Sequence, residues 1–208
     1  MKKTWFQRAY YTFWCNLIRL WAKIWFRISY RHWERVPRTG AVILIANHQS
    51  FLDPPLIGIG LTRYCHFMAR KTLFRGLFGW HLRNLNAFPI SQDGNPIGGI
   101  KETLRLLKQG EAVVIFPEGS RSFDGKLQPF QGGILTVAKR AKVPIVPCAI
   151  RGAYEALPRG SKFPKPRKII VTYGQPIPVE EIQKMSETEL LEQLTQKVRN
   201  LFNSIELR

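Results

Sequence analysis

The sequence predicts an α/β fold in which a mixed, largely parallel sheet is flanked by helices. Three observations support this prediction. Short apolar runs with the length of buried strands alternate along the chain with segments of helical periodicity. Polar clusters directly follow two of these runs, and parallel α/β sheets carry their sites at the ends of such strands. The N-terminal residues differ from the rest and predict an amphipathic helical segment that docks on a membrane.

Length and composition limit the number of domains and the kinds of partner. At 208 residues the chain is long enough for one α/β domain with its own core. Thirty-two Lys and Arg against fourteen Asp and Glu give a formal net charge of +18, which predicts an anionic membrane surface or a nucleic acid as partner. The three cysteines and four histidines are scattered, which favours reduced thiols and disfavours a zinc site.

Residues 1–37 are predicted to form the membrane-associated segment, and no apolar run there has the roughly 18–20 residues of a membrane span. The first 40 residues hold nine Lys or Arg, one acid and five of the six tryptophans. At helical spacing one face carries Thr12, Asn16, Arg19, Lys23, Arg27 and Arg31, and the opposite face carries Trp14, Ile18, Trp21, Trp25 and Ile28. We favour membrane binding through Trp14, Arg19, Trp21, Lys23, Trp25 and Arg27. Two alternatives stay open, because the aromatic face can pack on the core or the segment can bind nucleic acid.

Residues 38–208 are predicted to form the α/β domain. Strands are expected at residues 41–47, 66–70, 87–91, 112–117, 145–152 and 168–174. Helices are expected to begin at residue 54 and to cover residues 72–84, 96–110, 131–142 and 186–202. Gly110 is the expected C-cap of its helix, and Ser186 with Glu189 is the capping box of the last one.

The first polar cluster is His48 and Asp53, which follow the apolar run "AVILIA" in the stretch "ANHQSFLDPP". A general base needs a neutral imidazole whose other ring nitrogen is held by an acceptor, and an aspartate can hold it. Five residues across a turn can bring the two side chains together. A His and an Asp at the start of a helix also have a purely structural interpretation.

The second polar cluster is "FPEGSRS", residues 116–122, at the end of another predicted strand. Gly119 allows backbone N–H groups to approach a ligand closely, the Ser120 hydroxyl can donate, and Arg121 can bind a phosphate with two hydrogen bonds. Glu118 can accept a hydrogen bond from a hydroxyl of the same ligand. The alternative is an ordinary β-turn, since Glu-Gly-Ser is common turn chemistry.

Together these stretches resemble the glycerophospholipid acyltransferase family. "NHQSFLD" matches its N-H-x-x-x-x-D motif and "FPEGSRS" its F-P-E-G-T/S-R-S motif. "VPIVP" resembles its fourth block, and "MARKTLFRGLFG", which contains Lys71, resembles the segment between its first two blocks. The resemblance covers roughly residues 38–178, and within the family it is greatest to members that acylate 1-acylglycerol-3-phosphate.

The resemblance implies an O-acyltransferase of phospholipid biosynthesis that makes phosphatidic acid. His48 with Asp53 would take the proton of the acceptor hydroxyl, which attacks the thioester of acyl-CoA or acyl carrier protein. Glu118, Gly119, Ser120, Arg121 and Lys71 would seat the lysophospholipid. No G-x-S-x-G nucleophile motif is present, so direct transfer is expected. The implied enzyme lies on the cytoplasmic face of the cell membrane, and it needs no cofactor, no metal and no nucleic-acid partner.

One position departs from the family pattern. Gln92, in "FPISQDG", stands where the family usually has an arginine that helps to hold the phosphate. Arg121 with Lys71 or Arg70 would then hold the phosphate alone, or the acceptor differs: glycerol-3-phosphate, another lysophospholipid or a lyso-ornithine lipid. From another class of function, a non-catalytic protein that binds anionic membranes or nucleic acid stays open.

Overall fold

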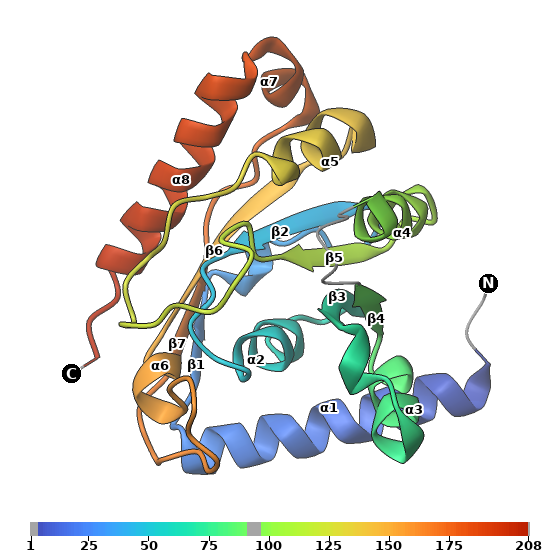
Figure 1. Ribbon diagram of the computed structural model, residues 1–208, viewed down its shortest axis with the longest axis vertical. Helices are drawn as coiled ribbons and strands as arrows, with labels where there is room; N and C mark the ends of the chain where they lie inside the picture. The colour runs from blue at the N-terminus through green and yellow to red at the C-terminus, as the bar shows by residue number, and fades with distance from the viewer. Residues whose placement is uncertain (1–3, 91–96, 208) are drawn as a thin grey trace.

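In residues 4–90 and 97–207, which the computed structural model describes, a seven-stranded sheet has the order β1-β7-β6-β2-β5-β3-β4 (Figure 1). The strands are β1 (Ser29–Arg31), β2 (Val42–Ala46), β3 (Cys65–Arg70), β4 (Ala87–Ile90), β5 (Ala112–Ile115), β6 (Ile145–Arg151) and β7 (Ile170–Tyr173). Neighbouring strands are parallel, except that β6 and β7 are antiparallel. The predicted mixed, largely parallel sheet is therefore confirmed.

Helices cover both faces of this sheet (Figure 1). They are α1 (Trp5–Trp25), α2 (Asp53–Ile59), α3 (Gly76–Asn84), α4 (Ile97–Lys108), α5 (Gly133–Ala141), α6 (Ala153–Ala156), α7 (Val179–Lys184) and α8 (Glu187–Asn203), with short 3-10 turns at Trp33–Arg35 and Lys71–Leu73. Alternate residues of a strand point to opposite faces. Val42 and Leu44 of β2 accordingly pack in the core beneath α1 and α2, while Ile43 packs in the core beneath α4, α5 and α8.

Two predicted helix ends are confirmed. The helix α8 begins with a complete capping box, in which the Ser186 hydroxyl accepts from the backbone N–H of Glu189 and the Glu189 carboxylate accepts from that of Ser186. The helix α4 is followed by Gly110 at φ +80°. The N–H groups of Gly110 and Glu111 bond to the carbonyls of Leu107 and Leu106, which is the Schellman arrangement that glycine favours.

The N-terminal helix is shorter than the sequence predicted. The helix α1 ends at Trp25, and Arg27 has a φ of +46°. Arg27, Ile28 and Arg31 were expected to lie on the two faces of this helix, and that expectation was wrong. Pairing of this segment with β7 replaces the helical hydrogen bonds there. The Ile169 N–H bonds to the Phe26 carbonyl, and residues 29–31 become the edge strand β1 beside β7. The sheet thus extends N-terminally of the boundary predicted at residues 37 and 38.

The predicted helix at residues 72–84 is also divided. A 3-10 turn precedes α3, and Gly76 has a φ of +53°, which breaks the helix. A Cβ on Gly79 would lie 2.2 Å from the backbone carbon of Phe74, so this close return of the chain requires glycine.

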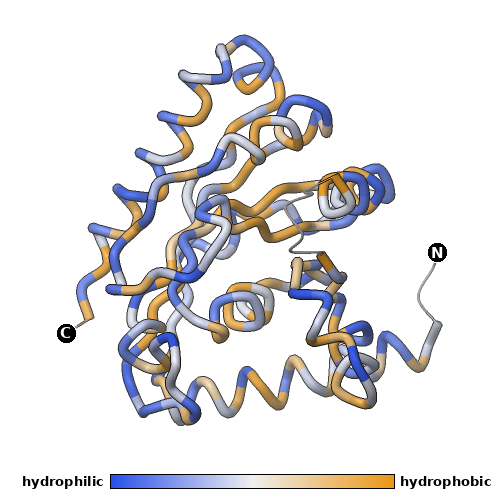
Figure 2. The backbone as a smooth tube through the Cα atoms, viewed as in Figure 1, coloured by the Kyte–Doolittle hydropathy of each residue, from blue (hydrophilic) through white to orange (hydrophobic). Residues whose placement is uncertain are grey.

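The helix α1 exposes an apolar face that shares only Trp21 and Trp25 with the predicted one. Its exposed large side chains are Trp5, Phe6, Phe13, Leu17, Leu20, Trp21, Ile24 and Trp25, and Figure 2 shows apolar segments along the helix. Trp14 and Ile18 of the predicted membrane face are instead half-buried, and Ile18 packs against the core. None of the helices in the described part of the chain is long and apolar enough to cross a membrane.

Candidate active site

His48 and Asp53 lie together at the carboxyl edge of the sheet, directly after β2. The Nδ1 atom of His48 is 2.8 Å from Oδ2 of Asp53. The Asp53 side chain is fully buried, while 18% of the His48 side chain remains exposed. Because a carboxylate can only accept, Nδ1 carries the proton and the other ring nitrogen, Nε2, is left without it in the neutral imidazole.

Backbone N–H groups of the preceding loop donate hydrogen bonds to the Asp53 carboxylate. The N–H groups of Gln49 and Ser50 both donate to Asp53 Oδ2, at 2.5 Å and 2.7 Å. Asp53 is the first residue of α2, where the orphan N–H groups of a helix favour negative charge. Asn47 is fully buried, and its side-chain amide exchanges two 2.9 Å hydrogen bonds with the backbone of Ile150 in β6. The loop that carries His48 is thus fixed at both ends.

The stretch "FPEGSRS" lies against this loop. The His48 ring stacks on Phe116 with centroids 4.2 Å apart. The backbone N–H of His48 donates to Glu118 Oε1 at 2.8 Å, and the Ser122 N–H donates to the His48 carbonyl, also at 2.8 Å. The two predicted polar clusters therefore form one site, although 62 residues separate the end of "NHQSFLD" at Asp53 from Phe116.

Glu118 joins two segments of the protein itself. Its side chain is buried, with Oε1 bonded to the His48 N–H and Oε2 bonded to the Gln128 N–H at 3.2 Å. The sequence interpretation expected this carboxylate to accept from a substrate hydroxyl, but each oxygen already accepts from a backbone N–H group. Burial raises the pKa of Glu118 to about 7, although its two backbone hydrogen bonds act in the opposite direction.

Replacing Glu118 with glutamine is expected to remove a pH-dependent contribution to stability. With a pKa raised from 4.5 to about 7, the folded protein holds this proton over a pH range in which the unfolded chain releases it. The free energy of unfolding of the wild type, relative to that of E118Q, should therefore fall as the pH rises from about 4.5 to 7 and level off above. Chemical denaturation of both proteins across this range measures the difference. A difference that is constant, or that grows with pH, would contradict the prediction.

Arg121 lies in a group of cations beside the His–Asp pair. Its guanidinium stacks 3.5 Å from the centroid of the Phe51 ring. Partial burial lowers the pKa of Arg121, and the charges of Arg159 and Arg70 lower it further. Three arginines from distant parts of the chain are thus close enough to act on one another, and such a group favours a phosphate.

The remaining predicted residues of this cluster have more open positions. Gly119 has a φ of +70°, and a Cβ there would lie 2.6 Å from Gln131 Nε2. Ser120 is exposed, and Lys71 is exposed in the 3-10 turn that follows β3. Gln92 lies outside the described residues.

Sequence reasoning missed three residues of this site. Asn47 is the first residue of "NHQSFLD", and an asparagine at the end of an all-apolar strand was a usable signal of its own role. The stacking of Phe51 and the proximity of Arg159 had no local signal, because both depend on how separate loops meet in space.

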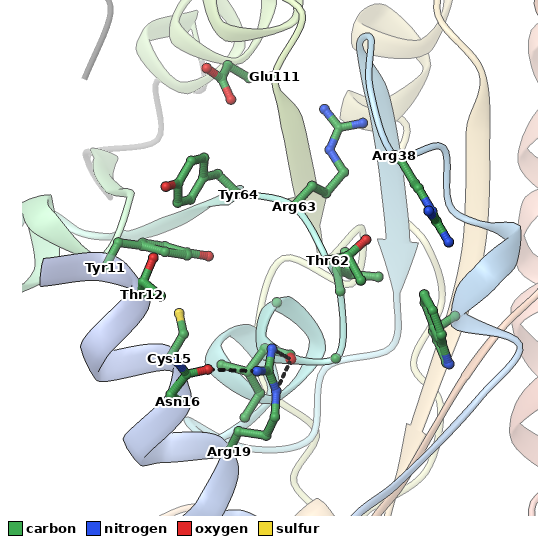
Figure 3. Close-up of a pocket in the computed structure, with 15 residues that line it drawn as sticks. Tyr11, Thr12, Cys15, Asn16, Arg19, Arg38, Thr62, Arg63, Tyr64 and Glu111 are labelled. Carbon is green, nitrogen blue, oxygen red and sulfur yellow. Dashed lines mark hydrogen bonds between the residues drawn. The ribbon is translucent and has the colours of Figure 1, made fainter. Parts of the chain in front are cut away.

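A cavity of about 670 Å³ lies away from this site, at the amino ends of β2, β3 and β5 and beside α1 (Figure 3). Its lining includes Arg38, Arg63 and Glu111, which precede these strands. Arg19, a predicted membrane-binding residue, also lines it and is turned toward the domain (Figure 3). Its guanidinium donates to the Ile59 carbonyl at 3.0 Å and 2.7 Å and to the Asn16 side chain at 2.9 Å.

The other predicted membrane-binding residues of α1 have varied surroundings. Trp14 packs edge-on against His81 of α3, with centroids 4.8 Å apart. Trp21 is partly exposed and packs on Phe26, and Trp25 donates from Nε1 to the Pro164 carbonyl at 3.3 Å. Lys23 is exposed. These side chains therefore do not form one outward face.

An imidazole is oriented here by a buried carboxylate, beside a group of arginines, at the carboxyl ends of the parallel strands β2 and β5. This arrangement is suited to an enzyme that deprotonates a hydroxyl group of an anionic substrate. The model of the Acyltransferase family matches residues 27–151. The chain belongs to this family, and it is an O-acyltransferase.

Individual relatives agree with this assignment. The chain is 30% identical over 179 residues to the 1-acyl-sn-glycerol-3-phosphate acyltransferase of Bacillus subtilis (strain 168), covering 83% of this chain and 87% of that protein. It is 28% identical over 205 residues to the enzyme of that name from Streptococcus pneumoniae, covering 96% and 74%. The crystal structure of the 1-acyl-sn-glycerophosphate (LPA) acyltransferase PlsC from Thermotoga maritima superposes with a TM-score of 0.79 at 27% identity, covering 100% of this chain and 85% of that one.

Proposed function

We propose that this enzyme transfers a fatty acyl group from acyl-CoA or acyl carrier protein to the free hydroxyl of 1-acylglycerol-3-phosphate, giving phosphatidic acid. The observation that carries the proposal is the 2.8 Å contact between His48 Nδ1 and the buried Asp53 carboxylate. The names of the Bacillus subtilis and Streptococcus pneumoniae relatives support this acceptor.

In the proposed reaction His48 Nε2 takes the proton from the acceptor hydroxyl as its oxygen attacks the thioester carbonyl. Asp53 keeps Nδ1 protonated and stabilises the imidazolium that forms. The tetrahedral intermediate collapses with breakage of the carbon–sulfur bond, and the proton on Nε2 passes to the leaving thiolate. The products are the acylated lipid and the free thiol of the donor, with His48 neutral again.

Glu118 acts in this proposal as a positioning residue. Its two oxygens bond to the backbone N–H groups of His48 and Gln128. It holds the loop that carries His48 against the loop that carries Arg121. The distance between the base and the phosphate-binding arginine is thereby fixed.

Arg121 is proposed to bind the acceptor phosphate, together with Arg70 and Lys71. Replacing Arg121 with alanine should raise the KM for the acceptor about 10- to 100-fold, because the variant loses a charged hydrogen bond to the phosphate. The change in kcat should be smaller. Arg121→Lys should recover part of the loss, since lysine keeps the charge but not the planar fork. Steady-state kinetics with varied acceptor measures both. Arg140, exposed on α5, is the matched control, and an R140A defect equal to that of R121A would contradict the assignment.

Mass spectrometry of the lipid products tests the reaction itself. The full-length protein and its His48→Ala variant are incubated with acyl-CoA or acyl carrier protein and a panel of lysolipids in anionic vesicles. Phosphatidic acid formed by the wild type alone is the expected result. Acylation of a different lysolipid would replace the acceptor but keep the chemistry, and no acylation from either donor would overturn the proposal.

The acceptor and product are lipids, so the enzyme is proposed to act at the cytoplasmic face of the cell membrane, where acyl thioesters occur. The exposed apolar side chains of α1, such as Phe13, Leu20 and Ile24, would enter the interface. Trp21 and Trp25 of the predicted apolar face are exposed as well, whereas Trp14 of that face is half-buried.

A further inference from the structure

Exposed apolar side chains also gather on α3, far along the chain from the N-terminal segment. In this nine-residue helix Leu77 is 81% exposed, Phe78 is 57% exposed and Trp80 is 43% exposed. Of the large exposed apolar residues in the described chain, most lie on α1 or α3. Large exposed apolar side chains gathered on two neighbouring helices indicate a contact surface.

The helix α3 is fixed against α1, so the two exposed surfaces move as one. The Tyr10 hydroxyl lies 2.6 Å from Nδ1 of His81. Tyr10 also packs edge-on against Trp80 with centroids 5.1 Å apart, and Trp14 packs on His81. Figure 1 shows α3 lying against α1 on the same side of the sheet.

The charge around α3 indicates the kind of partner. Residues 65–90, which include α3, contain no Asp or Glu but four Lys or Arg: Arg70, Lys71, Arg75 and Arg83. All four side chains are exposed. Apolar residues and a tryptophan bordered by cations alone fit the interface of an anionic bilayer, where rings sit at the headgroup level and cations meet phosphates.

We propose that α3 is a second membrane-contact element, and that Leu77, Phe78 and Trp80 enter the bilayer interface beside the outward face of α1. The inference rests on the proposed function. It adds a route for the acceptor, because α3 begins six residues after Arg70, whose charge acts on Arg121. A lysophospholipid can thus place its phosphate at these arginines while its acyl chain stays in the bilayer beside α3.

The test measures binding of the full-length protein to sedimented vesicles of phosphatidylcholine with and without phosphatidylglycerol. The double variant Leu77→Ser/Phe78→Ser should bind mixed vesicles at least about tenfold more weakly than the wild type, since two large apolar side chains no longer enter the interface. Ile97→Ser, which changes an exposed apolar residue on α4 at the other face of the sheet, should bind within about twofold of the wild type. Arg75→Glu/Arg83→Glu should weaken binding to the anionic vesicles and have little effect on the neutral ones.

Wild-type binding by the Leu77→Ser/Phe78→Ser variant, with an unchanged unfolding transition, would overturn the proposal. So would a wild-type dimer that the double variant converts to a monomer, because the face would then join two copies. The assay is repeated with the His48→Ala protein, which should bind vesicles like the wild type. Failure of acyl transfer and failure of membrane contact by α3 are therefore separate results.

Discussion

Replacing His48 with alanine is expected to lower kcat for acyl transfer by about 10³-fold, within the range that general bases contribute. The reason lies in the geometry of one ring. Its Nδ1 is 2.8 Å from Asp53, so Nε2 is the nitrogen that can receive the acceptor's proton. Alanine offers no base, and water at the site has neither the position nor the basicity to replace it. The measurement is initial-rate acyl transfer with saturating donor and acceptor.

The fold should survive this substitution. Asp53 Oδ2 keeps its hydrogen bonds from the Gln49 and Ser50 N–H groups without the imidazole. His66 is the control, because it lies near the amino end of β3, whereas the site lies at the carboxyl ends of the strands. Its Nε2 is 3.6 Å from a carboxylate oxygen of Glu111. His66→Ala should keep its kcat within a few-fold of the wild type. If its defect equalled that of His48→Ala, the assignment of the base would be wrong.

Replacing Asp53 with asparagine should lower kcat by about 10²-fold or more while leaving the protein folded. Asparagine has nearly the same shape, and its carbonyl oxygen can accept from the Gln49 and Ser50 N–H groups that now bond to Oδ2. It lacks the negative charge that stabilises the imidazolium during proton transfer. The loss should appear in kcat rather than in the KM for the acceptor, because Asp53 is fully buried and makes no contact with the lipid in the proposed mechanism.

Comparing Asp53→Ala with Asp53→Asn distinguishes the effect of the negative charge on catalysis from the effect of the side-chain hydrogen bonds on stability. It leaves two buried backbone N–H groups without an acceptor, at a cost of about 1–3 kcal/mol each in the free energy of unfolding. Denaturant titration should therefore show Asp53→Ala to be clearly less stable than Asp53→Asn, although both are poor catalysts. Full activity of Asp53→Asn would show that the carboxylate only shapes the loop.

The N-terminal helix shows the limit of periodicity as a predictor. A repeat near 3.6 residues correctly indicates a helix and its amphipathic character. The periodicity shows which side chains share a face of the helix, but it does not show which face packs against the rest of the protein. Here Tyr11 and Ala22 are buried, Arg19 turns toward the domain, and Phe13 and Leu20 face outward. Trp21 and Trp25 belong to both the predicted stripe and the exposed one, whereas Trp14 belongs only to the predicted stripe.

Glu118 shows the same limit in the site. Its place in "FPEGSRS" marks it as part of the site, but the sequence does not say whether its carboxylate faces a ligand or the protein. That depends on the distance between two loops, and the structure places the N–H groups of His48 and Gln128 within reach of its two oxygens.

The sequence by itself determined six of the seven strands, the mixed sheet, the end of α4 at Gly110 and the capping box of α8, but it did not indicate β1, α6 or α7. It also placed His48 and Asp53 after β2 and Arg121 after β5. These features depend on short-range forces, namely local hydrogen bonds, backbone preferences and the alternation of apolar residues. Only the tertiary structure decided that residues 29–31 join the sheet, that α3 packs against α1, and that Arg70 and Arg159 act on Arg121. Those features depend on contacts between segments that are far apart in the sequence, and a local sequence pattern does not indicate which distant segments pack or pair with one another.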